Sequence, residues 1–219
     1  MRGLYAITPE TLDLSKLIEQ VRHAIAGGAT VVQYRSKLNI DIARKRAEAL
    51  RAVTRETGTI FIVNDNCDLA LSVGADGVHI GRDDGDVNAI SRIRDKYATR
   101  FPAGPSVSFI IGVSCYNELA RAETAVAAGA DYIAFGSFFP SLTKPTAAHA
   151  DVALIREAKA SFAVPIVAIG GITVENAQQL ISANVDAVAV ITDLFDADDI
   201  ELRARQFTNL FKSRDHVHQ

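Results

Sequence analysis

The sequence alternates short runs of apolar, β-branched residues with longer stretches that carry apolar residues at helical spacing, and this pair recurs eight times. The alternation is typical of parallel βα units, in which each strand is followed by a helix that crosses back over the sheet. Several short runs are apolar almost throughout, as in strands covered on both faces. The predicted strands lie at residues 4–8, 30–35, 60–64, 77–80, 109–114, 132–136, 166–170 and 187–192.

The predicted helices include residues 14–26, 40–57, 117–128, 152–161, 174–183 and 198–212. Similar short segments close four of the helical stretches just before a strand, at 26–29, 73–76, 128–131 and 183–186. Each contains a Gly or an Asn, which can supply the left-handed residue at a helix C-terminus. This recurring loop indicates a repeated structural unit.

Eight βα units within 219 residues leave two architectures, a closed barrel or an open doubly wound sheet. The number of units favours the barrel, and no GxGxxG motif follows the first strand to support a dinucleotide-binding sheet. We therefore predict an α/β protein with a single (β/α)8 TIM-barrel domain over residues 1–212. Residues 213–219 are predicted to form a disordered tail.

Charge and hydropathy exclude two classes of partner. The net charge is −3 and both signs are mixed along the chain, so the sequence does not predict a nucleic-acid-binding surface. No run approaches the roughly 18 apolar residues of a membrane helix, so no membrane partner and a cytoplasmic location are predicted. Cys67 and Cys115 are far apart and are predicted to be free thiols.

Polar residues at the ends of the predicted strands carry functional weight, because barrel enzymes place their chemistry there. Gln33, Arg35 and Lys37 alternate after the second strand and would share one face of an extended segment, which suits phosphate oxygens. The alternative is a solvated strand end with two cations. Asp65 and Asp84 follow the neighbouring third and fourth strands and could share Mg²⁺. Singly, each would cap a helix or be solvated.

The remaining strand ends also have two interpretations. Ser114 ends the fifth strand as a hydroxyl at the rim, or it caps the next helix. Lys144 lies in a long loop after the sixth strand and could reach a phosphate, or it is an ordinary surface cation. Gly170 and Gly171 could let backbone N–H groups approach a phosphate, or could simply form a turn. His79 is predicted to pack inside the barrel without a catalytic role.

Together these segments resemble the thiamine-phosphate synthase family over nearly the whole chain. No single segment is diagnostic, but their joint occurrence at this spacing is highly specific. The matching segments are LYAIT at 4–8, QYRSK at 33–37, VND at 63–65, GVHIGRDD at 77–84, FPSLTK at 139–144 and IGGI at 169–172.

The resemblance implies a transferase of thiamine biosynthesis that joins 4-amino-2-methyl-5-hydroxymethylpyrimidine diphosphate to a thiazole phosphate, giving thiamine phosphate and pyrophosphate. It implies two small-molecule sites and one Mg²⁺ per subunit. By resemblance, the pyrimidine diphosphate contacts Gln33, Tyr34, Arg35, Ser36, Lys37, Asn64, Ser114 and Lys144, of which Arg35, Lys37, Lys144 and Ser114 would be catalytic. Asp65 and Asp84 would hold Mg²⁺, and the thiazole phosphate would contact Ser141, Leu142, Thr143, Gly170, Gly171, Ile191 and Thr192.

The implied reaction is dissociative: Mg²⁺ and the cations help pyrophosphate leave, and the thiazole nitrogen captures the pyrimidine cation. The sequence departs from the family pattern at Arg82 and Asp83, at Ser141 and at Thr192. Two competing hypotheses are a thiazole tautomerase-like paralogue, which typically has a His where Ser137 lies, and a non-catalytic regulator that binds thiazole phosphate. Homo-oligomers are common among such barrels, so a homo-oligomer is compatible with the sequence.

Overall fold

The computed structural model describes residues 1–11, 13–81, 87–101, 109–140 and 150–217. The strands within this part are β1 (Gly3–Ile7), β2 (Val31–Tyr34), β3 (Ile60–Asn64), β4 (Gly77–Ile80), β5 (Ile110–Tyr116), β6 (Tyr132–Phe135), β7 (Ile166–Ile169) and β8 (Ala187–Val190). The helices are α1 (Leu14–Ala26), α2 (Ile40–Thr57), α3 (Cys67–Val73), α4 (Val87–Arg100), α5 (Leu119–Ala127), α6 (Val152–Ser161), α7 (Val174–Ser182), α8 (Thr192–Phe195) and α9 (Ile200–Val217).

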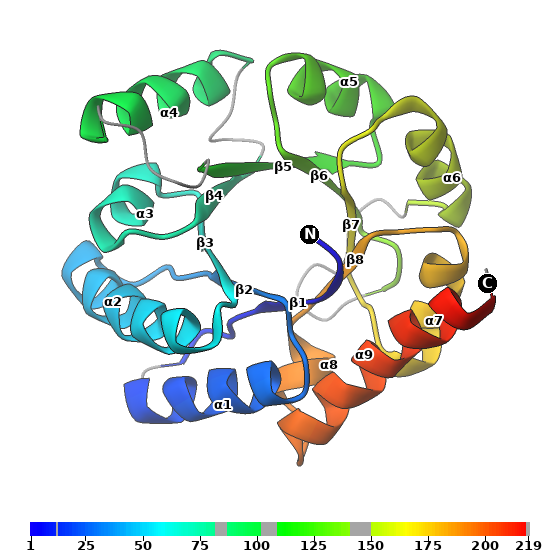
Figure 1. Ribbon diagram of the computed structural model, residues 1–219, viewed down its shortest axis with the longest axis horizontal. Helices are drawn as coiled ribbons and strands as arrows, with labels where there is room; N and C mark the ends of the chain where they lie inside the picture. The colour runs from blue at the N-terminus through cyan, green and yellow to red at the C-terminus, as the bar shows by residue number, and fades with distance from the viewer. Residues whose placement is uncertain (12, 82–86, 102–108, 141–149, 218–219) are drawn as a thin grey trace.

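The strands form a closed parallel barrel, in which each strand pairs with the next and β8 pairs with β1. The closing register places Gly3 beside Ala187 and Ala6 beside Val190. In Figure 1 the helices surround the ring of strands, and the N-terminus lies inside that ring. The predicted (β/α)8 barrel is therefore confirmed.

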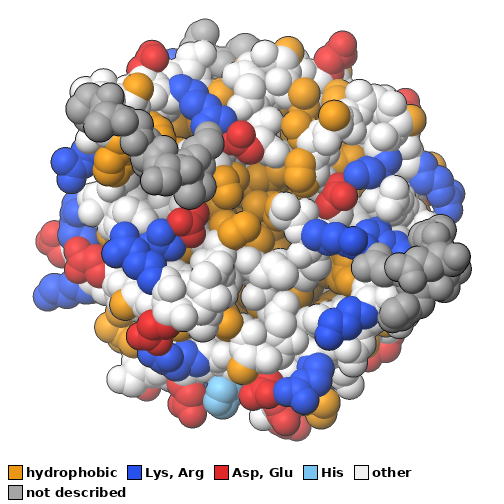
Figure 2. Space-filling view, in the orientation of Figure 1, with side chains coloured by type: hydrophobic (Ala, Val, Ile, Leu, Met, Phe, Trp, Pro, Cys, Tyr) orange, Lys and Arg blue, Asp and Glu red, His pale blue; other side chains and the backbone are white. Residues whose placement is uncertain are grey.

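Two layers of apolar side chains form the core, because successive side chains of a strand point to opposite faces. In β1, Leu4 belongs to the outer layer between strands and helices, whereas Tyr5 belongs to the inner layer that fills the barrel. Leu17 and Leu50 pack into the outer layer from α1 and α2, and Val167 contributes to the inner one. Figure 2 shows hydrophobic side chains at the centre of one end of the molecule and charged side chains around them.

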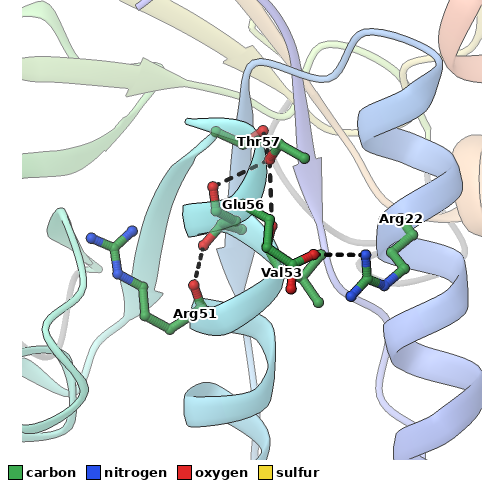
Figure 3. A network of polar contacts seen from close by, with 7 residues as sticks. Arg22, Arg51, Val53, Glu56 and Thr57 are labelled. Carbon is green, nitrogen blue, oxygen red and sulfur yellow. Dashed lines mark hydrogen bonds and ion pairs between the residues drawn. The ribbon is translucent and has the colours of Figure 1, made fainter.

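Helix α1 shows how the sequence forms the outer wall. It begins after Asp13, whose carboxylate accepts a hydrogen bond from a backbone N–H three residues later. Leu17 and Val21 are four residues apart and therefore lie on the same, buried face. On the exposed side, Arg22 forms a 2.9 Å ion pair with Glu56 of α2 (Figure 3). The apolar face thus fixes the helix against the barrel, and an exposed ion pair joins it to its neighbour.

The recurring loop predicted before the strands is confirmed. Gly28, Gly74, Gly129 and Asn184 have φ values of 104°, 64°, 96° and 71°, in the left-handed region. Each follows a helix and precedes the next strand, so the four loops reverse the chain in the same way.

Three of these loops end in an aspartate, whose carboxylate accepts a hydrogen bond from a backbone N–H near the start of the preceding strand. Before β4, the carboxylate of Asp76 accepts a 2.8 Å hydrogen bond from the backbone N of Phe61 in β3. Both of its oxygens also accept hydrogen bonds from the guanidinium of Arg51 in α2, at 2.7 and 2.8 Å. This arrangement, which we call a clamp, ties one helix and two strands together at the N-terminal end of the barrel.

The clamp recurs at an equal spacing along the chain. Asp131 accepts from the backbone N of Ile111 at 2.7 Å and pairs with Arg94 at 2.6 Å. Asp186 accepts from the backbone N of Ile166 at 2.7 Å and pairs with a lysine of α6 at 2.9 Å. In the equivalent position before β2, the hydroxyl of Thr30 donates to the backbone at the start of β1. The barrel therefore consists of four similar quarters.

The structure differs from the sequence prediction at several boundaries. Strand β2 ends at Tyr34, one residue earlier than predicted, whereas β5 continues two residues further, to Tyr116. Helices α3, α4 and α8 were not among the predicted helices. Helix α9 extends to Val217, so helix occupies most of the segment for which a disordered tail was predicted.

Cys67 is half-buried and Cys115 is buried, and both are free thiols, as predicted. Burial raises the pKa of both thiols. Within the described ranges, every helix is too short or too polar to cross a lipid bilayer.

Candidate active site

The C-terminal ends of the strands meet at one rim of the barrel, and most of the predicted site residues lie there. Asn64 and His79 are register partners on β3 and β4, so they face the same side of the sheet. Ser114 on β5 faces that side as well, because its hydroxyl hydrogen-bonds to His79 at 2.9 Å. From β2, Gln33 enters the same interior. The barrel thus brings together side chains from four consecutive strands.

Beyond the end of β2, the structure separates residues that we expected to share one face. Gln33 is buried, with 3% of its surface exposed, and points into the barrel. Tyr34 points the other way into the outer apolar layer, and burial raises its pKa. Arg35 is half-buried and Lys37 is exposed, and both follow the strand end. The alternation of side chains along β2 therefore explains only why Gln33 points into the barrel. Arg35 and Lys37 lie beyond the strand, and the loop sets their positions.

The loop after β2 is fixed mainly through its backbone. The backbone N of Arg35 donates to the hydroxyl of Thr8 at 3.1 Å, and that of Lys37 donates to the carboxylate of Glu10 at 3.2 Å. The Ser36 hydroxyl accepts from the backbone of the same loop. These bonds leave the two cationic side chains to project from an anchored backbone.

After β3, the backbone turns sharply at Asp65, which has a left-handed φ of 60°. The side-chain amide of Asn64 donates to the Asp65 carboxylate at 2.5 Å, and the Asp65 backbone N donates to the His79 carbonyl at 2.7 Å. The cap of α3 is the next residue, Asn66, whose side chain accepts from a backbone N–H of the helix. Capping therefore accounts for Asn66 and not for Asp65, whose exposed carboxylate stays at the rim.

Inside the barrel, five side chains from five strands form one chain of hydrogen bonds. The Gln33 amide nitrogen donates to the Tyr5 hydroxyl at 2.9 Å, and the Tyr5 and Tyr132 hydroxyls are 2.8 Å apart. The Tyr132 hydroxyl lies 2.9 Å from His79 Nδ1, and His79 Nε2 lies 2.9 Å from the Ser114 hydroxyl. We call this set the interior chain.

The interior chain confirms the prediction for His79 and removes one of the two interpretations of Ser114. His79 is packed and hydrogen-bonded inside the barrel, as predicted, and burial lowers its pKa to about 4, so the ring is neutral at neutral pH. Ser114 does not cap a helix, because β5 continues past it and α5 begins after Glu118. Tyr5 and Tyr132 were missed by the sequence reasoning. Both occupy inward positions of strands, but their pairing depends on barrel closure.

The loops after β7 and β6 are packed tightly together. Gly170 and Gly171 have φ values of 100° and 63°, and a Cβ atom on either would overlap Ser137 or the backbone at Pro140. Backbone conformation and packing therefore require both glycines, whether or not a phosphate binds there. Nearby, the Ile191 side chain packs against the inner layer.

The last strand end and two other segments complete the predicted set. Thr192 is exposed at the start of α8. Asp84, Arg82 and Asp83 lie in 82–86 and Ser141, Leu142, Thr143 and Lys144 lie in 141–149, so these predictions fall outside the described residues. In the remainder of the chain, no group of three or more His, Cys, Asp and Glu side chains is arranged to hold a metal.

The chain is similar to known proteins over most of its length. A family model described as thiamine monophosphate synthase matches residues 4–194. The thiamine-phosphate synthase of Methylobacillus flagellatus is 50% identical over 212 residues, covering 96% of this chain and 96% of that protein. That of Nitrosospira multiformis is 49% identical over 211 residues, covering 96% and 86%.

Solved structures give the same result. Thiamine phosphate pyrophosphorylase from Pyrococcus furiosus has a TM-score of 0.79 at 32% identity, covering 96% of each chain. More distant barrels share the fold alone: 3-keto-L-gulonate-6-phosphate decarboxylase from Vibrio cholerae has a TM-score of 0.72 at 14% identity, covering 97% of this chain and 99% of that one. The chain therefore belongs to the thiamine monophosphate synthase family.

Proposed function

We propose that this protein is a thiamine-phosphate synthase, which joins hydroxymethylpyrimidine diphosphate to thiazole phosphate and releases pyrophosphate. The observation that carries this proposal is the similarity to proteins named thiamine-phosphate synthase, at 46–50% identity over 96% of the chain. The rim supports it, because neighbouring strands bring amide and hydroxyl groups together there. Arg35 and Lys37 follow the end of β2, and Asp65 follows the end of β3.

The pyrimidine diphosphate would bind over β2 to β5. Gln33 and Ser114 would contact the ring, because both end the interior chain at the rim. Arg35, Lys37 and Lys144 would bind the diphosphate, together with Asn64. The backbone bonds that anchor the loop after β2 favour such a role for Arg35 and Lys37. Tyr34 and Ser36 would support the conformation of the loop after β2 rather than contact the pyrimidine ring, since Tyr34 faces the outer layer.

The reaction breaks the bond between the pyrimidine methylene carbon and the diphosphate oxygen. The electron pair of this bond stays with the departing pyrophosphate, whose charge Arg35, Lys37 and Lys144 would stabilise. The electron-rich aminopyrimidine delocalises the cation left on the carbon, and the thiazole nitrogen then donates its lone pair to form the new C–N bond. This route requires no strong base from the enzyme.

The residues at the rim fit a divalent cation. The Asp65 carboxylate is exposed, and capping does not use it. Carboxylate oxygens are the hard ligands that Mg²⁺ prefers. Asp65 and Asp84 would hold one Mg²⁺ per subunit, and the ion, when bound, supplies positive charge that stabilises the leaving pyrophosphate. Asn64 would orient Asp65 through its 2.5 Å hydrogen bond.

The thiazole phosphate would bind over β6 to β8, where barrel enzymes commonly bind phosphate. The contacts in this proposal are Ser141, Leu142, Thr143, Gly170, Gly171, Ile191 and Thr192. The left-handed glycines support it, because backbone without side chains allows an anion to approach closely. A cytoplasmic location and the state of assembly stay predictions from the sequence.

Turnover with defined substrates tests the proposal. The purified protein is incubated with both substrates and Mg²⁺, and thiamine phosphate and pyrophosphate are measured. We expect both products in equal amounts. Absence of product under conditions where a known synthase is active would refute the synthase assignment, and thiazole phosphate binding without turnover would favour a regulator.

A pair of variants tests the metal site. Asp65→Asn keeps the size of the side chain but removes its charge, and we expect turnover to fall on the order of 100-fold. Asp68→Asn is the control, because Asp68 is exposed on α3 and pairs with Lys96 at 2.8 Å. Equal activity of the two variants would remove Asp65 from the metal site.

A further inference from the structure

The interior chain is unusual in its surroundings. Its neighbours inside the barrel are apolar, and Tyr5 and Tyr132 are each only 1% exposed. Buried hydroxyl and imidazole groups are costly unless each donor finds an acceptor. The barrel makes room for the arrangement at Gly112, where a Cβ atom would overlap the ring and hydroxyl of Tyr132. The fold therefore accommodates a polar path from β2 to β5 through its own core.

The chemistry of its members gives the chain a direction. The Gln33 amide nitrogen can only donate, and it donates to the Tyr5 hydroxyl. The Tyr5 hydroxyl hydrogen must then go to Tyr132, because it would otherwise stay buried without an acceptor. In turn, Tyr132 donates to His79 Nδ1, which leaves the hydrogen of the neutral ring on Nε2. His79 Nε2–H then donates to the Ser114 oxygen.

This direction fixes what the two ends offer to a ligand. At one end, the chain uses the amide nitrogen of Gln33 and leaves its oxygen as an acceptor. At the other end, the Ser114 oxygen accepts from His79, so the Ser114 hydrogen can be donated outward. A 4-aminopyrimidine carries a donor, its amino group, and acceptors, its ring nitrogens. An acceptor and a donor at the rim therefore complement this ring.

From this we infer that Tyr5, Tyr132 and His79 are positioning residues, which hold Gln33 as an acceptor and Ser114 as a donor and so select a 4-amino over a 4-oxo pyrimidine. The inference rests on the proposed function and adds how the site would distinguish between pyrimidines. A 4-oxo group would face the Gln33 oxygen with a second acceptor. The amide can turn to accommodate it only if the whole chain reverses or leaves a buried hydrogen unpaired.

Binding measurements on a Tyr5→Phe variant test the selection. This substitution keeps the ring and removes the hydroxyl that holds the Gln33 amide. Dissociation constants are measured by calorimetry for the 4-amino diphosphate and its 4-oxo analogue. We expect the wild-type preference for the amino compound to fall on the order of 10-fold in Tyr5→Phe, as the loss of one orienting hydrogen bond allows. If Tyr5 had only a structural role, the substitution would weaken the binding of both compounds equally.

The matched control is Tyr97→Phe, because Tyr97 lies on α4 and stacks on Phe109, outside the barrel interior. Its preference should equal that of the wild type. An unchanged preference in Tyr5→Phe would overturn the inference while leaving the synthase assignment intact. If the wild-type protein binds neither pyrimidine and forms no product, the proposed function fails, and this inference fails with it.

The histidine tautomer gives a second test, which is read from the wild-type protein. Nitrogen-15 NMR of the wild-type protein distinguishes a hydrogen on Nε2 from one on Nδ1, and the His79 signals are assigned with a His79→Gln variant. We expect the Nε2–H form at neutral pH. The Nδ1–H form would reverse the chain and overturn the inference.

Discussion

Removal of the Asp76 carboxylate should cost far more stability than removal of an exposed carboxylate in an ion pair. Asp76→Ala breaks a clamp: the backbone N–H of Phe61 loses its acceptor, and Arg51 loses both of its hydrogen bonds. The two side chains are mostly shielded, with 14% of Arg51 and 28% of Asp76 exposed. The substitution thus removes the acceptor of three hydrogen bonds, one from the Phe61 backbone and two from the Arg51 guanidinium, in a partly buried setting.

The size of the effect follows from these contacts. An unsatisfied backbone donor costs about 1–3 kcal/mol. Loss of a partly buried ion pair adds about 1–2 kcal/mol, between the values for exposed and for buried pairs. We therefore expect Asp76→Ala to lower the free energy of unfolding by about 3 kcal/mol. Turnover at low temperature should not change, because the clamp lies at the opposite end of the barrel from the rim.

Urea denaturation at neutral pH measures the difference. The control is Glu56→Ala, which removes the exposed ion pair of Figure 3; Arg22 and Glu56 are 50% and 56% exposed. We expect the control to cost less than about 0.5 kcal/mol. A double-mutant cycle with Arg51→Met isolates the ion-pair contribution. A loss below about 1 kcal/mol in Asp76→Ala, or no coupling to Arg51, would refute the clamp as a stabilising unit.

Three further outcomes are expected. Gly112→Ala should lower the free energy of unfolding by about 3 kcal/mol or more in urea, because its Cβ overlaps Tyr132; unchanged stability would contradict that packing. Burial lowers the pKa of His79 to about 4 from an unfolded value near 6.5, so the unfolded state binds more protons between these values and stability falls as the pH drops. At pH 5 this loss should be about 2 kcal/mol relative to pH 7.5, and equal pH profiles of wild type and His79→Gln would argue against it. Arg35→Gln should raise KM for the pyrimidine diphosphate on the order of 10-fold and leave KM for thiazole phosphate unchanged; equal effects on both would contradict a diphosphate contact.

The fold could be predicted from the sequence because its signals are local. A strand, a helix and a left-handed glycine before the next strand are each encoded within a few residues, and Gly74 and Gly129 have the predicted conformation. Short helices were harder. Helix α8 has four residues and α3 has seven, which is less than the length over which helical periodicity is distinct.

The site was only partly predictable, because it depends on which strands meet. The sequence places Gln33 and Ser114 at strand ends, but not that Tyr5, Tyr132 and His79 connect them. That connection exists only once the barrel closes. At Ser114 the local sequence left two interpretations open, and only the structure excludes the helix cap, since the strand continues past it and its hydroxyl hydrogen-bonds to His79.

The clamps also show which segments of the chain connect one quarter of the barrel to the next. Each clamp joins residues within one quarter, for example α2 to β4, and the segments that follow β4 and β6 link consecutive clamped quarters. Asp84 and Lys144 belong to these linking segments. Insertions or replacements in these segments change no residue of a clamp, so we expect substrate preference to diverge through them while the clamp residues stay the same. Because stability and substrate preference depend on different segments, we expect the linking segments to be exchangeable between related barrels without loss of the fold.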